Sequence, residues 1–98
     1  MTTVALVVKL TARPGLEEEV ADFLSGAVEL ANQEPGTPVW YALRSESTFW
    51  IVDAFPGPTE RQAHLDGPIA AALMANADRL LSTPPEIIPA DVLASKLP

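Results

Sequence analysis

The sequence predicts an α+β fold in which a strand, a helix, two strands, a helical region and a last strand follow one another. Two observations support this order. Short segments rich in valine and aromatic residues alternate with longer segments whose apolar residues recur at helical spacing. A polar segment, residues 45–48, separates two adjacent apolar strands and is typical of a hairpin. The order β-α-β-β-α-β is the ferredoxin-like arrangement, with an antiparallel four-stranded sheet and its helices on one face.

The first strand and the first helix are separated by residues 13–15, Arg-Pro-Gly. Residues 3–11 form an almost continuous run of valine and leucine, which is typical of a strand buried on both faces. The apolar residues that then recur at helical spacing are Leu16, Val20, Phe23, Leu24, Ala27, Val28 and Ala31. Acidic residues fill the first turns, where the helix dipole favours negative charge. Residues 32–36 include a proline and a glycine, which end this helix.

The hairpin is expected to join strands over residues 39–44 and 49–55. If Glu46 and Ser47 form the turn, Trp40 lies opposite Asp53. The face that contains this pair carries Trp40, Ala42, Ile51, Asp53 and Phe55. The other face carries Val39, Tyr41, Leu43, Trp50, Val52 and Ala54. A register slip of one residue would exchange the two sets.

The second half begins with a short helix over residues 58–65. Pro68 is suited to open the next helix, which is expected to extend to Leu81 and to stop before Pro84 and Pro85. Residues 86–97 are expected to form the last strand. Pro89 places this strand at an edge of the sheet or at a bulge, because proline cannot donate a hydrogen bond to a neighbouring strand.

The length and composition limit the classes of function. The 98 residues are expected to form a single domain, and 48% of them are hydrophobic. The net charge of −7 opposes binding to nucleic acid or to an anionic membrane surface. The chain has no cysteine and one histidine, so a transition-metal site is not expected. Without a signal-peptide pattern or a long apolar run, we expect a cytoplasmic protein.

The high apolar content indicates a second chain as a partner. Helices can cover only one face of the predicted sheet, so the apolar residues of the other face would be exposed in a monomer. We therefore expect a homodimer that packs through the open sheet face. The residues expected in this interface are Tyr41, Leu43, Trp50 and Val52.

His64 is the best candidate for chemistry, because imidazole gains or loses a proton near neutral pH. It follows the third strand, close to Asp53, and could act as a general base with Asp53 as its partner. Alternatively, His64 could lie on the helix surface and Asp53 could pair with Arg44 or Arg61. Further candidates for substrate binding are Trp40, Phe55, Phe49 and Asn76. The aromatic residues could equally belong to an ordinary core, and Asn76 could face solvent.

Three short motifs resemble the antibiotic biosynthesis monooxygenase (ABM) family. They are Arg13-Pro14-Gly15 before the first helix, Glu34-Pro35-Gly36 before the second strand, and Ala63-His64-Leu65 after the third. The resemblance covers almost the whole chain through the order and spacing of its elements. It implies a dimeric α+β barrel with a ligand pocket between sheet and helices in each subunit.

The resemblance also implies a range of activities. Characterised relatives oxidise phenolic polyketides or hydroquinones with molecular oxygen and without a bound cofactor, while others degrade haem or isomerise sugar-like metabolites. The chain departs from the family pattern at the end of the third strand, where Glu-x-Trp is replaced by Asp53-Ala54-Phe55. The asparagine of polyketide-oxidising relatives is replaced by Ile51. The first strand lacks the asparagine of the haem-degrading branch, which argues against haem degradation.

The sequence therefore predicts a cofactor-independent monooxygenase that oxidises an aromatic, hydroquinone-like or enolisable small molecule. Two alternatives stay open. One is a non-catalytic dimer of the same fold that binds a small molecule. The other is an isomerase that uses His64 without oxygen.

Overall fold

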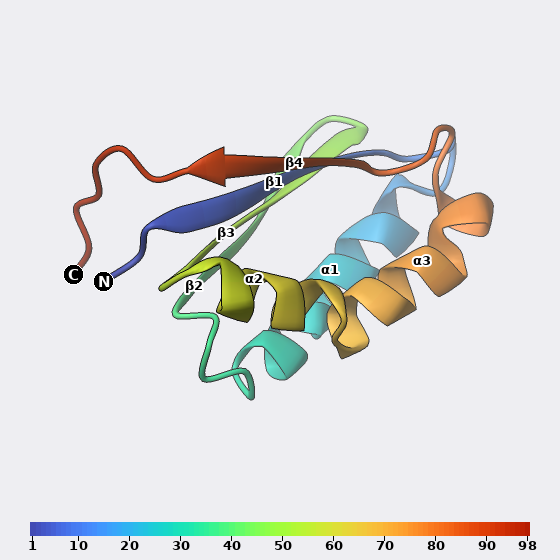
Figure 1. The fold of residues 1–98 in the computed structure, drawn as a ribbon. Coiled ribbons are helices and arrows are strands. Elements are labelled where there is room, and N and C mark those ends of the chain that lie inside the picture. Colours follow the sequence, from blue (N-terminus) through green and yellow to red (C-terminus); the bar gives the residue numbers. More distant parts are fainter.

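The computed structural model describes all 98 residues and has the predicted α+β architecture. Its elements are β1 (Val4–Thr11), α1 (Glu17–Ala31), β2 (Val39–Ser45), β3 (Thr48–Phe55), α2 (Pro58–Leu65), α3 (Pro68–Leu80) and β4 (Glu86–Asp91). The four strands form one antiparallel sheet in the order β2-β3-β1-β4. All three helices lie on one side of the sheet (Figure 1). The ferredoxin-like prediction is confirmed.

The register of the β2–β3 hairpin is also confirmed. Trp40 pairs with Asp53, and the turn between the strands consists of Glu46 and Ser47. Glu46 has a φ of +56°, which a two-residue hairpin turn requires. The side chains that β3 and β1 turn towards the helices form the centre of the core. They are Phe49, Ile51, Phe55, Val4, Leu6, Val8 and Leu10.

The strands predicted over residues 3–11, 39–44 and 49–55 each differ from the observed strands by one residue, and two boundaries in the second half of the chain are also wrong. The last strand ends at Asp91 rather than at residue 97, because its neighbour β1 begins at Val4, the residue that pairs with Asp91. Helix α3 ends at Leu80, one residue earlier than predicted. Leu81 already has an extended backbone and forms a bridge with Ala12, so the chain turns back to the sheet before Pro84.

The first strand differs from the predicted strand with two buried faces. Buried residues alternate along β1 with partly exposed ones, because no helix covers the second face of the sheet (Figure 1). On that face Tyr41 is 57% exposed, Leu43 is 47% exposed and Ile88 is 51% exposed. None of the three helices is both long and apolar enough to cross a membrane.

Candidate functional site

Three side chains from distant parts of the chain meet under the sheet: Glu34, Asp53 and His64. His64 Nδ1 lies 2.7 Å from Glu34 Oε1, and His64 Nε2 lies 3.0 Å from Asp53 Oδ2. The imidazole is therefore held between two carboxylates, one at each ring nitrogen. We call these residues the carboxylate–imidazole cluster.

Local structure explains how each member reaches the cluster. Asp53 is on the helix-facing side of β3, and His64 is the one buried residue of α2. Glu34 lies in the turn after α1, where its carbonyl accepts a hydrogen bond from the Thr37 amide at 3.1 Å. The Thr37 hydroxyl donates to Glu34 Oε1 at 3.0 Å, so the carboxylate that contacts His64 is itself held in place.

The cluster is almost closed to solvent. The side chains of Asp53, His64 and Glu34 are 1%, 6% and 18% exposed. Burial lowers the pKa of His64, but its contacts with Asp53 and Glu34 and the charges of both carboxylates outweigh this effect. The pKa of His64 is consequently raised above its usual 6.5, which favours the imidazolium form with a proton on each ring nitrogen.

Some buried polar atoms around the cluster have no hydrogen-bond partner. They are both carboxylate oxygens of Asp53, Glu34 Oε2 and the indole Nε1 of Trp40; the contact of Asp53 Oδ2 with His64 Nε2 at 3.0 Å is a close ionic contact and not an aligned hydrogen bond. A buried polar atom without a partner costs about 1–3 kcal/mol. Close packing alone therefore does not explain why these polar atoms are buried without partners. A water molecule or a ligand with polar groups would supply the missing hydrogen bonds.

His64 lies between a small, partly open cavity and a larger, more open groove. The cavity, about 30 Å³, is lined by Asp53 and His64 together with Leu6, Val8, Ile51, Leu65, Ile69, Ala70, Leu73 and Ile87. The groove, about 300 Å³, is lined by residues 33–37, Glu60, Ala63, His64, Gly67 and Pro68. Asp53 thus faces the cavity and Glu34 faces the groove. The cavity has room for one or two water molecules, so a larger ligand would have to displace side chains.

Two of the predicted substrate-binding residues lie beside the cluster. The Phe55 ring is fully buried, and its centroid lies 5.3 Å from that of the His64 ring. Trp40 is paired with Asp53 across the hairpin and packs against the core. Neither residue lines the cavity.

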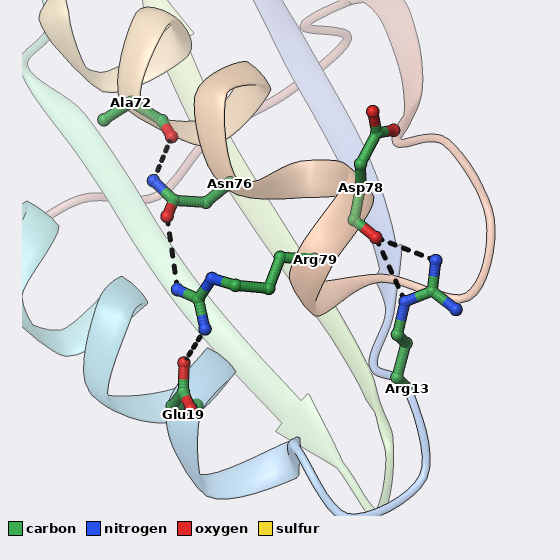
Figure 2. A network of polar contacts seen from close by, with 6 residues as sticks. All are labelled: Arg13, Glu19, Ala72, Asn76, Asp78 and Arg79. Carbon is green, nitrogen blue, oxygen red and sulfur yellow. Dashed lines mark hydrogen bonds and ion pairs between the residues drawn. The ribbon is translucent and has the colours of Figure 1, made fainter.

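The structure places Phe49 and Asn76 elsewhere. Phe49 is four positions before Asp53 on β3 and packs beneath the guanidinium of Arg44, 5.2 Å from its ring centroid. The Asn76 amide donates to the Ala72 carbonyl at 2.8 Å, and its oxygen accepts from Arg79 Nη2 at 3.2 Å. Figure 2 shows this network on α3, where Arg79 also pairs with Glu19 of α1.

The two arginines considered as partners of Asp53 have other partners. Arg44 pairs with Glu18 at 2.7 Å, and Arg61 Nη1 donates to the carbonyls of Ala5 and Ala90 at 3.3 Å each. No group of three or more histidine, cysteine or acidic side chains is arranged to hold a metal ion.

Sequence reasoning missed Glu34 as a member of the site. The residue belongs to the Glu34-Pro35-Gly36 motif, which was interpreted as the end of a helix and as a family resemblance, with no role for its carboxylate. The acidic side chain of this motif was a candidate partner for the chain's one histidine. That pairing was the signal that could have placed Glu34 near His64.

Comparison with solved structures shows what the fold resembles. A candidate ABM protein from Nitrosomonas europaea superposes with a TM-score of 0.83 at 15% identity, over 94% of this chain and 91% of the other. Another, from Chloroflexus aurantiacus, has a TM-score of 0.73 at 20% identity, over 97% of each chain. At these identities the likeness concerns the fold. This protein has the ABM fold.

A much nearer relative is the NE2512 protein of Nitrosomonas europaea, whose function is unknown. It is 56% identical to this chain, with a TM-score of 0.97, over 100% of this chain and 96% of the other. The two proteins belong to one family. No protein-family model and no curated protein matched the chain.

Proposed function

We propose that this protein is a cofactor-independent monooxygenase that oxidises a small phenolic, hydroquinone-like or enolisable compound with O2. The observation that carries the proposal is the buried Asp53 carboxylate. Its Oδ1 atom has no partner, and Asp53 lines an apolar cavity together with His64, whose pKa the two carboxylates raise. An acceptor of this kind fits a ligand that brings a hydroxyl or an acidic C–H group.

The chemistry begins with proton transfer. Asp53 accepts the proton of the ligand, and the electron pair stays on the ligand as a phenolate or enolate. The neighbouring His64 cation stabilises that anion, in an apolar surrounding where such an interaction is stronger than in water. The anion passes one electron to O2, and the resulting radical and superoxide combine to a peroxide. The peroxide anion takes back the proton held by Asp53, and the resulting hydroperoxide loses water: its O–O bond breaks, the carbon that carries it gives up its remaining hydrogen, and a carbonyl group is left.

This assignment exchanges the roles expected from the sequence, where His64 was the base and Asp53 its partner. Both nitrogens of His64 already face carboxylates, at 2.7 and 3.0 Å. An imidazolium in that position has no lone pair with which to accept a proton. Asp53 has a free oxygen, so it is the better proton acceptor.

Oxygen uptake with a panel of hydroquinones and anthrones tests the proposal. We expect Asp53→Asn to lower the turnover rate by roughly 10²–10⁴-fold, because the amide cannot accept the proton. The matched control is Asp66→Asn, an exposed carboxylate two residues after His64, which should leave the rate unchanged. An Asp53→Asn variant that turns over at the wild-type rate would refute Asp53 as the base.

A second candidate function is binding of a small molecule without catalysis. The observation that favours it is the small apolar cavity, in which Ile51 lies where polyketide-oxidising relatives carry an asparagine. Saturable binding of a panel compound without oxygen uptake by the wild-type protein would support this function over the first.

We further propose that the protein acts as a homodimer that packs through its open sheet face. The exposed side chains of Tyr41 and Leu43 support this proposal, together with the partly exposed Trp50 and Val52. The structure adds Ile88 of β4, which lies on the same face.

A further inference from the structure

The groove side of the cluster contains a carboxylate to which the proposed reaction assigns no role. We propose that Glu34 is a positioning residue: it holds the His64 ring with Nε2 towards Asp53 and keeps the positive charge on that ring. This inference rests on the proposed function, in which the charged ring stabilises the anion of the ligand. Glu34 would act through His64, without touching the ligand in the cavity.

The first support is the geometry of the contact. Glu34 Oε1 receives two donors, His64 Nδ1 at 2.7 Å and the Thr37 hydroxyl at 3.0 Å. A ring held through Nδ1 cannot rotate without losing this hydrogen bond. Nε2 is thereby kept 3.0 Å from Asp53 Oδ2, on the cavity side. A second carboxylate at Nδ1 fixes which ring nitrogen faces the reaction.

The second support is the close packing of the turn that carries Glu34. A Cβ atom added at Gly36 would lie 3.3 Å from Cβ and Cγ of Glu60 on α2. A Cβ added at Gly67 would lie 3.2 Å from the His64 carbonyl oxygen and 3.9 Å from Glu34 Oε2. Gly36 therefore lets the turn after α1 approach the first turn of α2 closely, while Gly67 lies in ordinary contact with the Glu34 carboxylate, and this packing brings Glu34 to the ring.

The third support is the scarcity of other charges that could act on His64. Asp53 of β3 and Glu34 are the charged groups in contact with the ring. The residues of β1, β4 and α3 that line the cavity with it are all apolar. On α2 itself, Arg61 points to the carbonyls of Ala5 and Ala90, and Glu60 lines the groove. Asp66 accepts a hydrogen bond from Gln62.

NMR titration of the ring tests the inference, and the chain's one histidine makes its signal unambiguous. Glu34→Gln keeps the length and an acceptor oxygen but removes the charge. We expect the titration midpoint of His64 to fall by about one pH unit or more, because a neighbouring opposite charge shifts such a midpoint by roughly 1–3 units. Glu60→Gln is the matched control, since it removes a carboxylate from the same groove that does not contact the ring. It should leave the midpoint unchanged.

Glu34→Asp provides a second variant, in which the charge is retained but is withdrawn from the ring by one methylene group. Its midpoint should lie between those of the wild type and Glu34→Gln. A wild-type midpoint in Glu34→Gln, or an equal fall in Glu60→Gln, would overturn the inference. The titration needs no turnover, so its result is independent of the oxygen-uptake experiment. If turnover is found, its pH profile in Glu34→Gln should move in the same direction as the midpoint.

Discussion

At the scale of the residue, the main feature is one imidazole held between two carboxylates in a nearly closed site. His64 is 6% exposed, and each of its nitrogens faces an acidic side chain. Three ionisable groups are seldom buried together for packing alone, because desolvation of charge is costly. The buried Asp53 oxygen without a partner makes a role in binding or proton transfer a better explanation.

The sequence could place part of this site but not all of it. Asp53 and His64 were expected together because they follow one another closely along β3 and α2. Glu34 is 30 residues from His64, and its contact depends on how tightly the turn after α1 packs against α2. Such packing between distant segments depends on the whole fold, so it cannot be predicted from a local sequence pattern.

Phe49 and Asn76 show two different limits of prediction. Phe49 was expected to bind substrate, but four residues of a strand span about 13 Å, so it lies too far along the strand to contact a ligand at Asp53. That distance follows from the sequence. The direction of Asn76 does not, because it depends on hydrogen bonds with Ala72 and Arg79 on the same helix.

At the scale of the element, the β2–β3 hairpin sets the face on which Asp53 lies. Its turn was predictable, because the polar residues Glu46 and Ser47 separate two apolar strands, and few other pairings of these strands would keep their apolar residues on matching faces. The end of β4 was not predictable from its own residues. It is set by the start of β1, and the apolar residues after Asp91 continue without a strand to pair with.

Backbone strain in the hairpin turn is expected to lower the stability of the fold, which a substitution can test. Glu46 has a left-handed backbone, with a φ of +56°, which disfavours side chains other than glycine or asparagine. We expect Glu46→Gly to raise the free energy of unfolding by up to about 1 kcal/mol, measured by urea denaturation. The hydrogen bond from Arg44 Nε to the Glu46 carbonyl should persist, because it involves only the backbone of residue 46.

Ser47→Gly is the control for this prediction, since Ser47 has no positive φ. Glycine there only adds freedom to the unfolded chain and should lower the free energy of unfolding by about 0.4–1 kcal/mol. Equal effects of the two substitutions would contradict the argument from backbone strain.

At the scale of the whole molecule, the main feature is the open sheet face, through which we propose that the protein dimerises. Exposed apolar side chains from β2 and β4 border this face, which no helix covers (Figure 1). We expect the wild-type protein to be a dimer at micromolar concentration in light scattering. Leu43→Lys should raise the dissociation constant by at least roughly 100-fold, because a two-fold interface would bury the new charge twice.

Met74→Lys is the matched control for this substitution. Met74 is 58% exposed on α3, on the side of the sheet opposite to the proposed interface. The control variant should remain a dimer. A wild-type protein that is monomeric under these conditions would rule out the proposed interface.

The measurement that tests the central claim most directly is the protonation state of His64 in the wild-type protein. The account requires a cation, with Asp53 as the proton acceptor, and the pKa of His64 is raised above 6.5 by the two carboxylates. In an NMR titration of the imidazole nitrogens, we predict that the ring is still mostly protonated at pH 6.5 and loses its proton at higher pH. A ring that is mostly neutral at pH 6.5, with its midpoint below that value, would contradict the account and restore His64 as the base.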